Sequence, residues 1–253
     1  MFKIQNLRAG YAGKTILHDV SIDVPMGQVT VILGPNGCGK STLLKTICGI
    51  LSVETGEILL NGENLLTLPQ KEIAQRVAYL SQSRQIPDIT ARRLVLHGRF
   101  PYLSYPRRYR PQDYAAANAA IEQMGMASLA DMPLGCLSGG QRQKVYIAMA
   151  LAQDTPVILL DEPTTYLDIS HQLQLMRQAK ELTAQGKTVV MIVHDLSHAM
   201  AVADQIVLME QGCVVMQGTA EELYLSGKID SVFGVRLERV ETGSGFHYYC
   251  KEG

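Results

Sequence analysis

Hydrophobic and polar residues are spaced in two different ways along this chain. Short apolar or alternating runs, typical of β-strands, occur on both sides of residues 84–151, a segment that has helical spacing instead. The flanking segments, residues 1–83 and 152–253, also hold helical stretches between their strands, as α/β proteins do. The pattern therefore predicts a single α/β domain over residues 1–253, with a helical subdomain inserted between the two halves of its core.

Individual elements follow from the same pattern. The first 30 residues alternate as short strands of an antiparallel β subdomain, with turns expected at Ala9-Gly10 and at residues 25–27. Residues 235–250 are typical of a hairpin turned at residues 243–245. Between these segments we expect strands at residues 29–33, 58–61, 77–80, 157–160, 188–193 and 205–209, and helices at residues 41–50, 114–124, 141–151, 169–185 and 196–203.

The composition narrows the class of protein. Lys and Arg together number 23 against 24 Asp and Glu, so no net charge favours a nucleic-acid partner. The longest apolar runs fall short of the ~18 residues that a membrane helix needs, and the first residues lack the apolar core of a signal peptide. A cytoplasmic protein is therefore expected. The five cysteines are scattered, which favours reduced thiols over a metal site: Cys38, Cys48, Cys136, Cys213 and Cys250.

A glycine-rich segment joins the apolar strand at residues 29–33 to the helix expected at residues 41–50. Its glycines let successive backbone N–H groups converge on phosphate oxygens, and the positive end of the following helix faces the same point. Lys40 would reach the β- and γ-phosphates of a nucleotide, and the Ser41 hydroxyl would take a coordination place on Mg²⁺. The segment matches G-x-x-x-x-G-K-[ST] and reads Gly34, Pro35, Asn36, Gly37, Cys38, Gly39, Lys40 and Ser41, followed by Thr42.

Two acidic residues, Asp161 and Glu162, come directly after the apolar run at residues 157–160. A buried strand that ends in Asp161 can deliver a carboxylate to the metal shell, through a water molecule. Glu162 then stands where a carboxylate can polarise an attacking water. Together with the glycine loop, the two residues predict a site that hydrolyses nucleotides.

A second phosphate-binding turn, Ser138-Gly139-Gly140-Gln141, opens the helix expected at residues 141–151. Ser138 is a natural N-cap, and the bare backbone of Gly139 and Gly140 lets an anion approach the start of the helix. The chain carries only one copy of this turn and one glycine loop. This pairing predicts a protein that closes on a second copy of itself.

With these motifs the chain resembles the ATP-binding-cassette (ABC) ATPases over almost its whole length. The resemblance implies a P-loop NTPase core carrying an antiparallel β subdomain and an inserted α-helical subdomain. It also implies a head-to-tail homodimer that binds two ATP molecules with Mg²⁺. Each ATP would lie between the glycine loop of one copy and the Ser-Gly-Gly turn of the other.

The same resemblance assigns roles to single residues. It implies that Tyr11 stacks on the adenine, and that Gln82 senses Mg²⁺ and couples the site to a membrane partner. Glu162 corresponds to the catalytic base, and His194 to the histidine that contacts the γ-phosphate. Asp168 lies in the loop that crosses the dimer interface. With Ser41, Gln82 and Asp161 as metal-site residues, the resemblance predicts two complete sites in a homodimer.

Three segments resemble the cassettes of importers for iron chelates, namely ferric siderophores, haem and, more distantly, cobalamin: residues 98–101, 148–154 and 164–172. The resemblance implies permease subunits in the membrane, an extracytoplasmic substrate-binding protein that acts indirectly, and a position on the cytoplasmic face of the cell membrane. A soluble ABC ATPase of iron–sulfur cluster assembly is the alternative. Copurification with a permease or with a soluble scaffold would separate the two.

Residues 84–110 hold seven arginines and a single acidic residue, Asp88. A solvated basic face is one interpretation of this segment. The other is that it meets the cytoplasmic loops of a permease or lies near anionic lipid head groups. The arginines are Arg84, Arg92, Arg93, Arg99, Arg107, Arg108 and Arg110.

Overall fold

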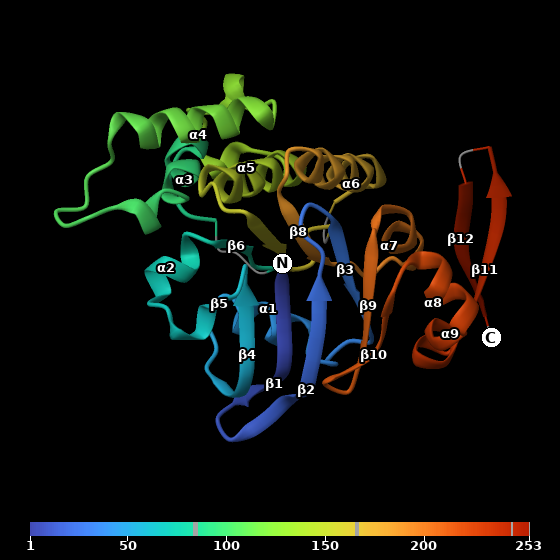
Figure 1. Ribbon diagram of the computed structural model, residues 1–253. Coiled ribbons are helices and arrows are strands. Elements are labelled where there is room, and N and C mark those ends of the chain that lie inside the picture. Colours follow the sequence, from blue (N-terminus) through green and yellow to red (C-terminus); the bar gives the residue numbers. More distant parts are fainter. Residues whose placement is uncertain (83–85, 165–166, 244, 253) are drawn as a thin grey trace.

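The computed structural model describes residues 1–82, 86–164, 167–243 and 245–252, and the strands within these ranges form three sheets. Figure 1 shows helices α3 (Ala91–His97), α4 (Pro111–Gln123) and α5 (Gly139–Ala152) above the two larger sheets. The hairpin of β11 (Val235–Thr242) and β12 (Gly245–Glu252) lies at one side. The helical spacing of residues 84–151 therefore corresponds to a helical layer on an α/β core.

The first sheet is antiparallel and has the strand order β2-β1-β4-β5. Its strands are β1 (Phe2–Tyr11), β2 (Lys14–Val24), β4 (Val53–Leu60) and β5 (Glu63–Asn64). The turn expected at Ala9-Gly10 was wrong, because β1 continues to Tyr11 and pairs with Lys14. The hairpin turns instead at Ala12 and Gly13, which both have positive φ, the geometry that matches the twist of two paired strands.

The second sheet forms the centre of the core and has the strand order β10-β9-β3-β8-β7-β6. Strands β3, β6, β7, β8 and β9 run parallel, and β10 is antiparallel to β9. The bounds are β3 (Val29–Leu33), β6 (Val77–Leu80), β7 (Val157–Leu160), β8 (Thr188–Ile192), β9 (Gln205–Glu210) and β10 (Cys213–Gly218). Every residue of β3, β7 and β8 is buried, which confirms that their apolar runs are central strands.

The carboxyl ends of four parallel strands lie next to one another. Leu80 of β6 is paired with Leu160 of β7, and Leu160 is paired with Met191 of β8. Ile32 of β3 is paired with Ile192 of β8. The residues that follow these strands therefore meet at one edge of the sheet, the usual place for a ligand site in a parallel sheet.

The helices expected from the sequence are all present, with ends that differ by a few residues. Helix α1 ends at Ile47 rather than residue 50, and Gly49 follows it with a φ of +67°, a frequent helix termination. No helix within the described residues is long and apolar enough to cross a membrane. The bounds are α1 (Lys40–Ile47), α2 (Gln70–Ala74), α3 (Ala91–His97), α4 (Pro111–Gln123), α5 (Gly139–Ala152), α6 (Ile169–Ala184) and α7 (Leu196–Val202).

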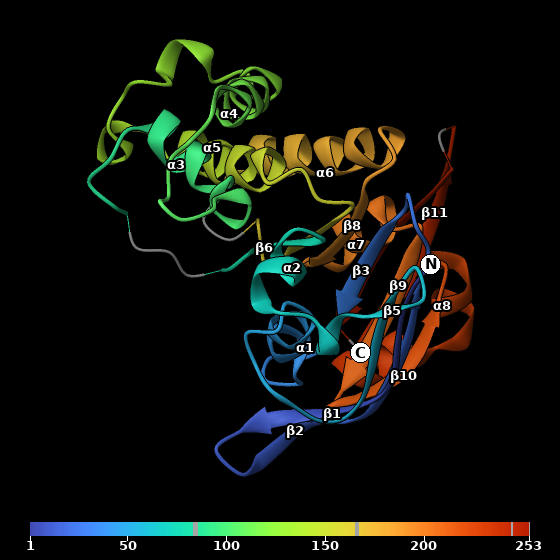
Figure 2. The same cartoon turned by 60° about the vertical axis from the view of Figure 1, so that its left-hand side comes forward.

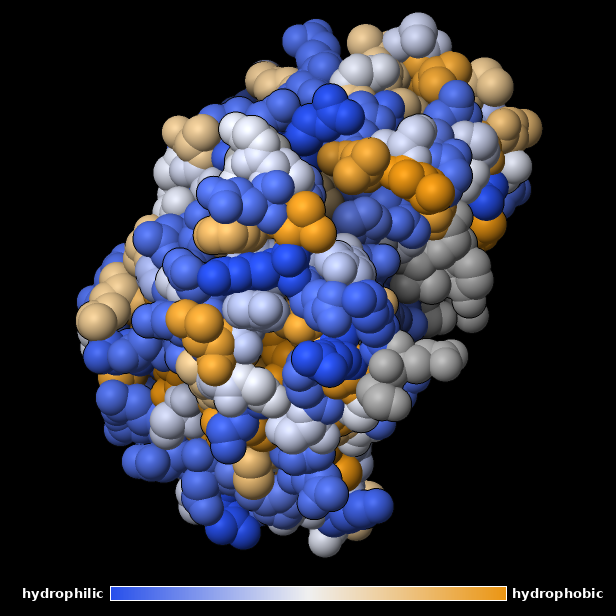
Figure 3. All heavy atoms as spheres, turned by 90° about the vertical axis from the view of Figure 1, so that its right-hand side faces the viewer, coloured by the Kyte–Doolittle hydropathy of each residue, from blue (hydrophilic) through white to orange (hydrophobic). Residues whose placement is uncertain are grey.

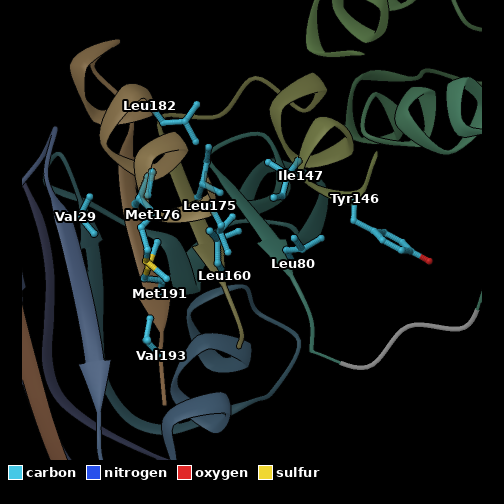
Figure 4. Close-up of a cluster of buried hydrophobic side chains, with 14 of the residues drawn as sticks. Val29, Leu80, Tyr146, Ile147, Leu160, Leu175, Met176, Leu182, Met191 and Val193 are labelled. Atoms are coloured by element: carbon cyan, nitrogen blue, oxygen red, sulfur yellow. The ribbon is translucent and has the colours of Figure 1, made fainter. Parts of the chain in front are cut away.

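Helix α5 joins the helical layer to the core. It packs against α3 and α4 on one side, and α6 runs beside it in the two ribbon views (Figures 1 and 2). Figure 4 shows Ile147 of α5 pointing toward Leu80 and Leu160 of the sheet and Leu175 of α6. These side chains belong to one buried cluster. Burial of this apolar face fixes the start of α5 relative to the sheet edge.

A buried ion pair holds the helical layer together. Arg99 Nε donates to Asp113 Oδ1 at 3.1 Å, and Arg99 also donates to the carbonyl of Ala152 at 2.9 Å. The other carboxylate oxygen of Asp113 accepts the backbone N–H of Arg110 at 2.8 Å. Arg99 and Asp113 are therefore structural residues, which removes Arg99 from the solvated basic face considered above.

The C-terminal part contains elements that the pattern did not predict. Strand β10 follows a tight turn at Gln211 and Gly212, which both have positive φ. The usual sequence signal for such a turn is Asn-Gly or Asp-Gly, and Gln-Gly is not one of these. Helices α8 (Ala220–Ser226) and α9 (Lys228–Phe233) lead to the predicted hairpin of β11 (Val235–Thr242) and β12 (Gly245–Glu252). Ser244, in the expected turn, lies outside the described residues.

The hairpin is attached to the core rather than extended into solvent. Strand β12 contacts α7, and Tyr248 packs against Tyr224 of α8 with ring centroids 5.6 Å apart. On this side of the molecule, apolar side chains are scattered among polar ones (Figure 3). The hairpin therefore covers part of the core and presents a mixed surface.

Candidate nucleotide-binding and hydrolysis site

The glycine loop connects β3 to α1 in a backbone shape that only glycine tolerates at its key positions. Gly34 has a φ of +153°, and a Cβ there would lie 2.2 Å from the carbonyl oxygen of Met209. Gly39 has a φ of +103° and directly precedes α1. The loop therefore lies against β9 and turns its backbone toward the start of the helix, as a phosphate-binding loop requires.

Lys40 is held in place by the loop itself. Its side chain is buried, and Nζ donates to the carbonyl oxygens of Gly34 at 2.7 Å and Pro35 at 2.9 Å. An ammonium group in this position supplies a positive charge at the mouth of the loop. Lys40 thus needs little rearrangement to meet a phosphate.

Asp161 is buried at the end of β7, where two hydroxyl groups satisfy its carboxylate. Ser41 Oγ donates to Oδ1 at 2.8 Å, and the Tyr79 hydroxyl donates to Oδ2 at 2.9 Å. Burial, and then the nearby Asp161 charge, raise the pKa of Tyr79 well above its usual range, so the phenol stays a donor. Tyr79 was not predicted as a site residue, although a tyrosine in the strand beside β7 was a signal for such a contact.

Residues that follow three neighbouring strands, β6, β7 and β8, contact one another at Glu162. The Gln82 amide, after β6, donates to Glu162 Oε2, and His194 Nε2, after β8, lies 2.6 Å from Glu162 Oε1. Glu162 itself has a φ of +48°, a conformation that costs a non-glycine residue free energy and is found mostly at functional sites. The structure thus brings together Gln82, Glu162 and His194, which are far apart in the sequence.

A pocket of about 220 Å³ lies over the glycine loop. Tyr11, which is 44% exposed, lies at the pocket together with Ile16 and Glu162. Ile16 was not predicted; its place in an alternating strand near the loop was the available signal. The lining residues are Tyr11, Ile16, Asn36, Gly37, Gly39, Lys40, Ser41, Thr42 and Glu162.

The Ser138 turn has the geometry expected of a helix start. Ser138 is the N-cap of α5: its Oγ accepts the backbone N–H of Gln141 at 3.3 Å, and its own N–H donates to Gln141 Oε1 at 2.9 Å. Gly139 and Gly140 form the first turn. None of residues 138–141 is among those described as lining the pocket over the glycine loop. Within one copy, the two phosphate-binding elements therefore do not share that pocket.

Asp168 occupies the N-cap of α6. Its Oδ1 accepts the backbone N–H of His171 at 2.9 Å, and the ring Nδ1 of His171 lies 2.8 Å away. The backbone N–H of His171, and then its ring, hold the pKa of Asp168 below its usual range. The neighbouring Thr165 and Tyr166, which carry part of the subfamily resemblance, lie outside the described residues.

The residues around Asp161 provide oxygen donors suited to Mg²⁺. Ser41 and Asp161 are hydrogen-bonded to each other, and the Gln82 side chain reaches Glu162, the next residue. No group of three or more His, Cys, Asp or Glu side chains in the described part of the chain could hold a metal ion alone. The donor set fits Mg²⁺ that takes most of its ligands from phosphates and water.

Comparison with known proteins identifies the family. The ABC transporter family matches residues 17–165, a range that contains the glycine loop, the Ser138 turn, Asp161 and Glu162. The chain belongs to the ABC transporter family. This membership confirms the resemblance and the fold class expected from the sequence. Tyr11, Asp168 and His194 lie outside the matched range, and their roles stay predictions.

Relatives and solved structures extend the match over the rest of this ABC protein. It is 42% identical over 238 residues to the iron(3+)-hydroxamate import ATP-binding protein of Bacillus subtilis, covering 93% of this chain and 88% of that protein. It is 41% identical over 230 residues to the hemin import ATP-binding protein of Rhodococcus jostii, covering 90% and 78%. A chain from a protein assigned to the metal-chelate type of ABC transporter, solved in an inward-facing conformation, superposes with a TM-score of 0.85. That chain is 26% identical, and the match covers 99% and 97% of the two chains.

The position of Cys38 in the glycine loop predicts its reactivity toward alkylating reagents. Burial raises the pKa of the Cys38 thiol, although Lys40 opposes this effect, and the thiolate is the form that reacts. We expect iodoacetamide at neutral pH to modify the exposed Cys136 and Cys213 before Cys38, and ATP to slow Cys38 further. Mass-spectrometric mapping of the alkylated peptides over time, at neutral and alkaline pH, measures these rates. Modification of Cys38 as fast as Cys136 would contradict the prediction.

Proposed function

We propose that this chain is the ATP-hydrolysing subunit of a bacterial importer that carries a ferric siderophore or haem through a membrane permease. One observation carries the proposal: relatives named for import of iron(3+)-hydroxamate and hemin share more than two-fifths of its residues over at least 90% of this chain. The residues needed for hydrolysis also lie together at one sheet edge. The protein would therefore act at the cytoplasmic face of the membrane.

ATP binding is assigned to the glycine loop and the start of α1. The backbone N–H groups of the loop and Lys40 bind the phosphates, and the positive end of α1 favours their charge. Tyr11 stacks on the adenine at the edge of the same pocket. Mg²⁺, held by Ser41, Gln82 and Asp161 when bound, supplies charge neutralisation for the β- and γ-phosphates.

Hydrolysis is assigned to Glu162. Its carboxylate is oriented by Gln82 on one oxygen and by His194 on the other, and a carboxylate can accept a proton from an attacking water. A base fixed in this way contributes typically 10²- to 10⁴-fold to the rate. His194, which is 43% exposed, is positioned to contact the γ-phosphate once ATP is bound.

A second copy of the chain completes the site. Residues 138–141 do not line the pocket over the glycine loop in the described structure, yet the Ser138 turn offers exposed polar groups at the start of α5. A head-to-tail homodimer would place that turn on the γ-phosphate held by the other copy. Asp168, whose side chain is 66% exposed, would lie at the interface between the copies.

The permease partner is assigned to a groove between the core and the helical layer. The groove has a volume of about 280 Å³ and is lined from the core by Ile50 and Tyr79, and from the helical layer by Phe100 and Met149. Ile50 is 58% exposed and Phe100 is 43% exposed, so an apolar segment of a permease loop could bury both. An extracytoplasmic substrate-binding protein would act on the permease and not on this chain.

The arginine-rich segment has a mixed role in the structure. Arg92 is bound by both carboxylate oxygens of Asp131, at 2.8 and 3.0 Å, and Arg99 is buried, while Arg84 lies outside the described residues. Arg93, Arg107, Arg108 and Arg110 are exposed. We therefore assign the proposed contact with permease loops or anionic head groups to these four side chains.

Reversal of charge at Arg107 and Arg108 tests this surface. We expect Arg107→Glu/Arg108→Glu to weaken membrane association by at least about thirtyfold, because each of the two basic side chains near an anionic surface contributes ~1 kcal/mol and every 1.4 kcal/mol is a factor of ten. Basal ATP hydrolysis should be unchanged, since neither residue lines the nucleotide pocket. Flotation with vesicles that contain the permease measures association, and Arg236→Glu, on the distant hairpin, is the matched control. Equal flotation of both variants would contradict the assignment.

Substrate uptake tests the proposed function. Source cells that carry either the natural chain or Glu162→Gln are given labelled ferric hydroxamate siderophore, haem and cobalamin in separate assays. Loss of siderophore or haem uptake in the Glu162→Gln cells supports the proposal and identifies the ligand. Loss of cobalamin uptake alone, or unchanged uptake of all three, overturns it, and the second result favours the soluble iron–sulfur alternative.

A further inference from the structure

The imidazole of His171 lies against Gly140. A Cβ added to Gly140 would meet Cδ2 and Nε2 of His171 at 2.6 Å and Cε1 at 3.0 Å. The φ of Gly140 does not itself demand glycine, because this residue lies in the first turn of α5. The space taken by the His171 ring, and not the backbone conformation, therefore requires a residue without a side chain at position 140.

The same imidazole is fixed from its other side by Asp168. Asp168 Oδ1 accepts the backbone N–H of His171 at 2.9 Å and lies 2.8 Å from the ring Nδ1. The ring is one-third exposed, so it is held by these contacts rather than by full burial. One side chain thus touches both the Ser138 turn and the residue that caps α6.

This contact is the end of a longer helix–helix interface. Residues at helical spacing from α5 and from α6 line one narrow space between the two helices. They are Gly140, Gln143, Lys144 and Ile147 on α5, and His171, Gln174, Leu175 and Gln178 on α6. At this end the His171 ring fills the space beside Gly140, so a movement of the first turn of α5 meets the ring on α6.

We propose that His171 is a positioning residue that holds the Ser138 turn at a fixed separation from Asp168 within each copy of the chain. Both elements face the other copy in the proposed dimer, so the inference rests on the proposed function. A fixed separation lets the turn and Asp168 meet the partner's bound ATP as one rigid unit. If that rigidity is lost, the reacting groups are less well aligned. This lowers the rate of hydrolysis rather than the affinity for ATP.

Two substitutions separate the two contacts of the ring. His171→Asn keeps an N–H donor near Asp168 and removes the far edge of the ring from Gly140. His171→Phe keeps a ring against Gly140 and removes the donor to Asp168. We expect each variant to lower the kcat of ATP hydrolysis by a factor of about 2 to 150, the range for coupled residues in contact, with KM for ATP within twofold of the natural value. Natural kcat in both variants would overturn the proposal.

Substitutions that change the size of the side chains at positions 140 and 171 test the contact between them directly. Gly140→Ala should lower kcat because its methyl group collides with the His171 ring, and Gly140→Ala/His171→Ala should recover at least about threefold of that loss. Gly135→Ala is the matched glycine control, since a Cβ there meets no atom within 4 Å. His198→Ala is the matched histidine control, because His198 has the same place after its cap Asp195 in α7. Additive effects of Gly140→Ala and His171→Ala on kcat would overturn the proposal.

A second measurement covers variants that fold poorly and separates this inference from the proposed function. Each substitution is combined with Glu162→Gln, and ATP-dependent dimer formation is measured by light scattering alongside thermal unfolding. Weaker dimers at an unchanged Tm support the positioning role, and equal dimers at a lowered Tm overturn it. If Glu162→Gln alone forms no dimer with ATP, the proposed function fails, and the inference fails with it.

Discussion

Glu162→Gln is expected to lower the kcat of ATP hydrolysis by at least about 100-fold, the usual consequence of removing a general base. The amide of the new side chain keeps an acceptor oxygen toward Gln82 but cannot take a proton from water. ATP binding should remain, because Lys40 and Ser41 are unchanged and their contacts do not involve Glu162. ATP should therefore accumulate on the protein and hold two copies together.

Single-turnover hydrolysis, ATP affinity and the oligomeric state of the Glu162→Gln variant measure these effects. Glu210→Gln is the control, since Glu210 also ends a strand of the same sheet but does not line the pocket over the glycine loop. Hydrolysis near the natural rate would remove Glu162 from its assigned role. Loss of ATP binding would show instead that the substitution disturbs the loop.

Arg99→Leu is expected to lower the free energy of unfolding by about 3–5 kcal/mol, because it leaves the carboxylate of Asp113 buried without its cation. The side chains of Arg99 and Asp113 are only 10% and 2% exposed, so water cannot replace the lost partner. The carbonyl of Ala152 loses its donor as well. Since this residue ends α5, the helical layer should loosen before the sheet does.

Urea unfolding followed by circular dichroism measures the loss of stability. Arg92→Leu is the matched control: its pair with Asp131 is 38% and 78% exposed, and such surface pairs contribute little to stability. Equal destabilisation by Arg99→Leu and Arg92→Leu would contradict the argument. Replacement of both Arg99 and Asp113 by apolar residues should recover part of the stability, because no unpaired charge is then buried.

Local chemistry explains why the sequence predicted the glycine loop and the Ser138 turn. The glycine loop and the Ser138 turn are continuous segments, and each works through its own backbone and the helix that follows it. Strands β3, β6 and β7 have the predicted bounds, because apolar runs of strand length between turn residues have few other stable structures. These features depend on residues that are neighbours in the chain.

Three local features were missed or misplaced although the sequence carried a signal for each of them. Strand β10 lies at the edge of its sheet, and its apolar run at residues 213–216 was not assigned to a strand. Helix α8 begins with a capping box of Thr219 and Glu222, a signal that the sequence did carry. The turn at Ala12 and Gly13 was misplaced by a few residues because Gly10 also looked like a turn residue.

The sequence by itself determined the central buried strands, the glycine loop, the Ser138 turn and the acidic pair after β7, since each is encoded by residues close together in the chain. Only the tertiary structure decided which strands are neighbours, and so brought Gln82 and His194 onto Glu162, Tyr79 onto Asp161 and His171 onto Gly140. Periodicity reports which face of an element is buried but not which element covers it. Strand order in a parallel sheet is set by packing between distant segments, and the catalytic arrangement is a consequence of that packing.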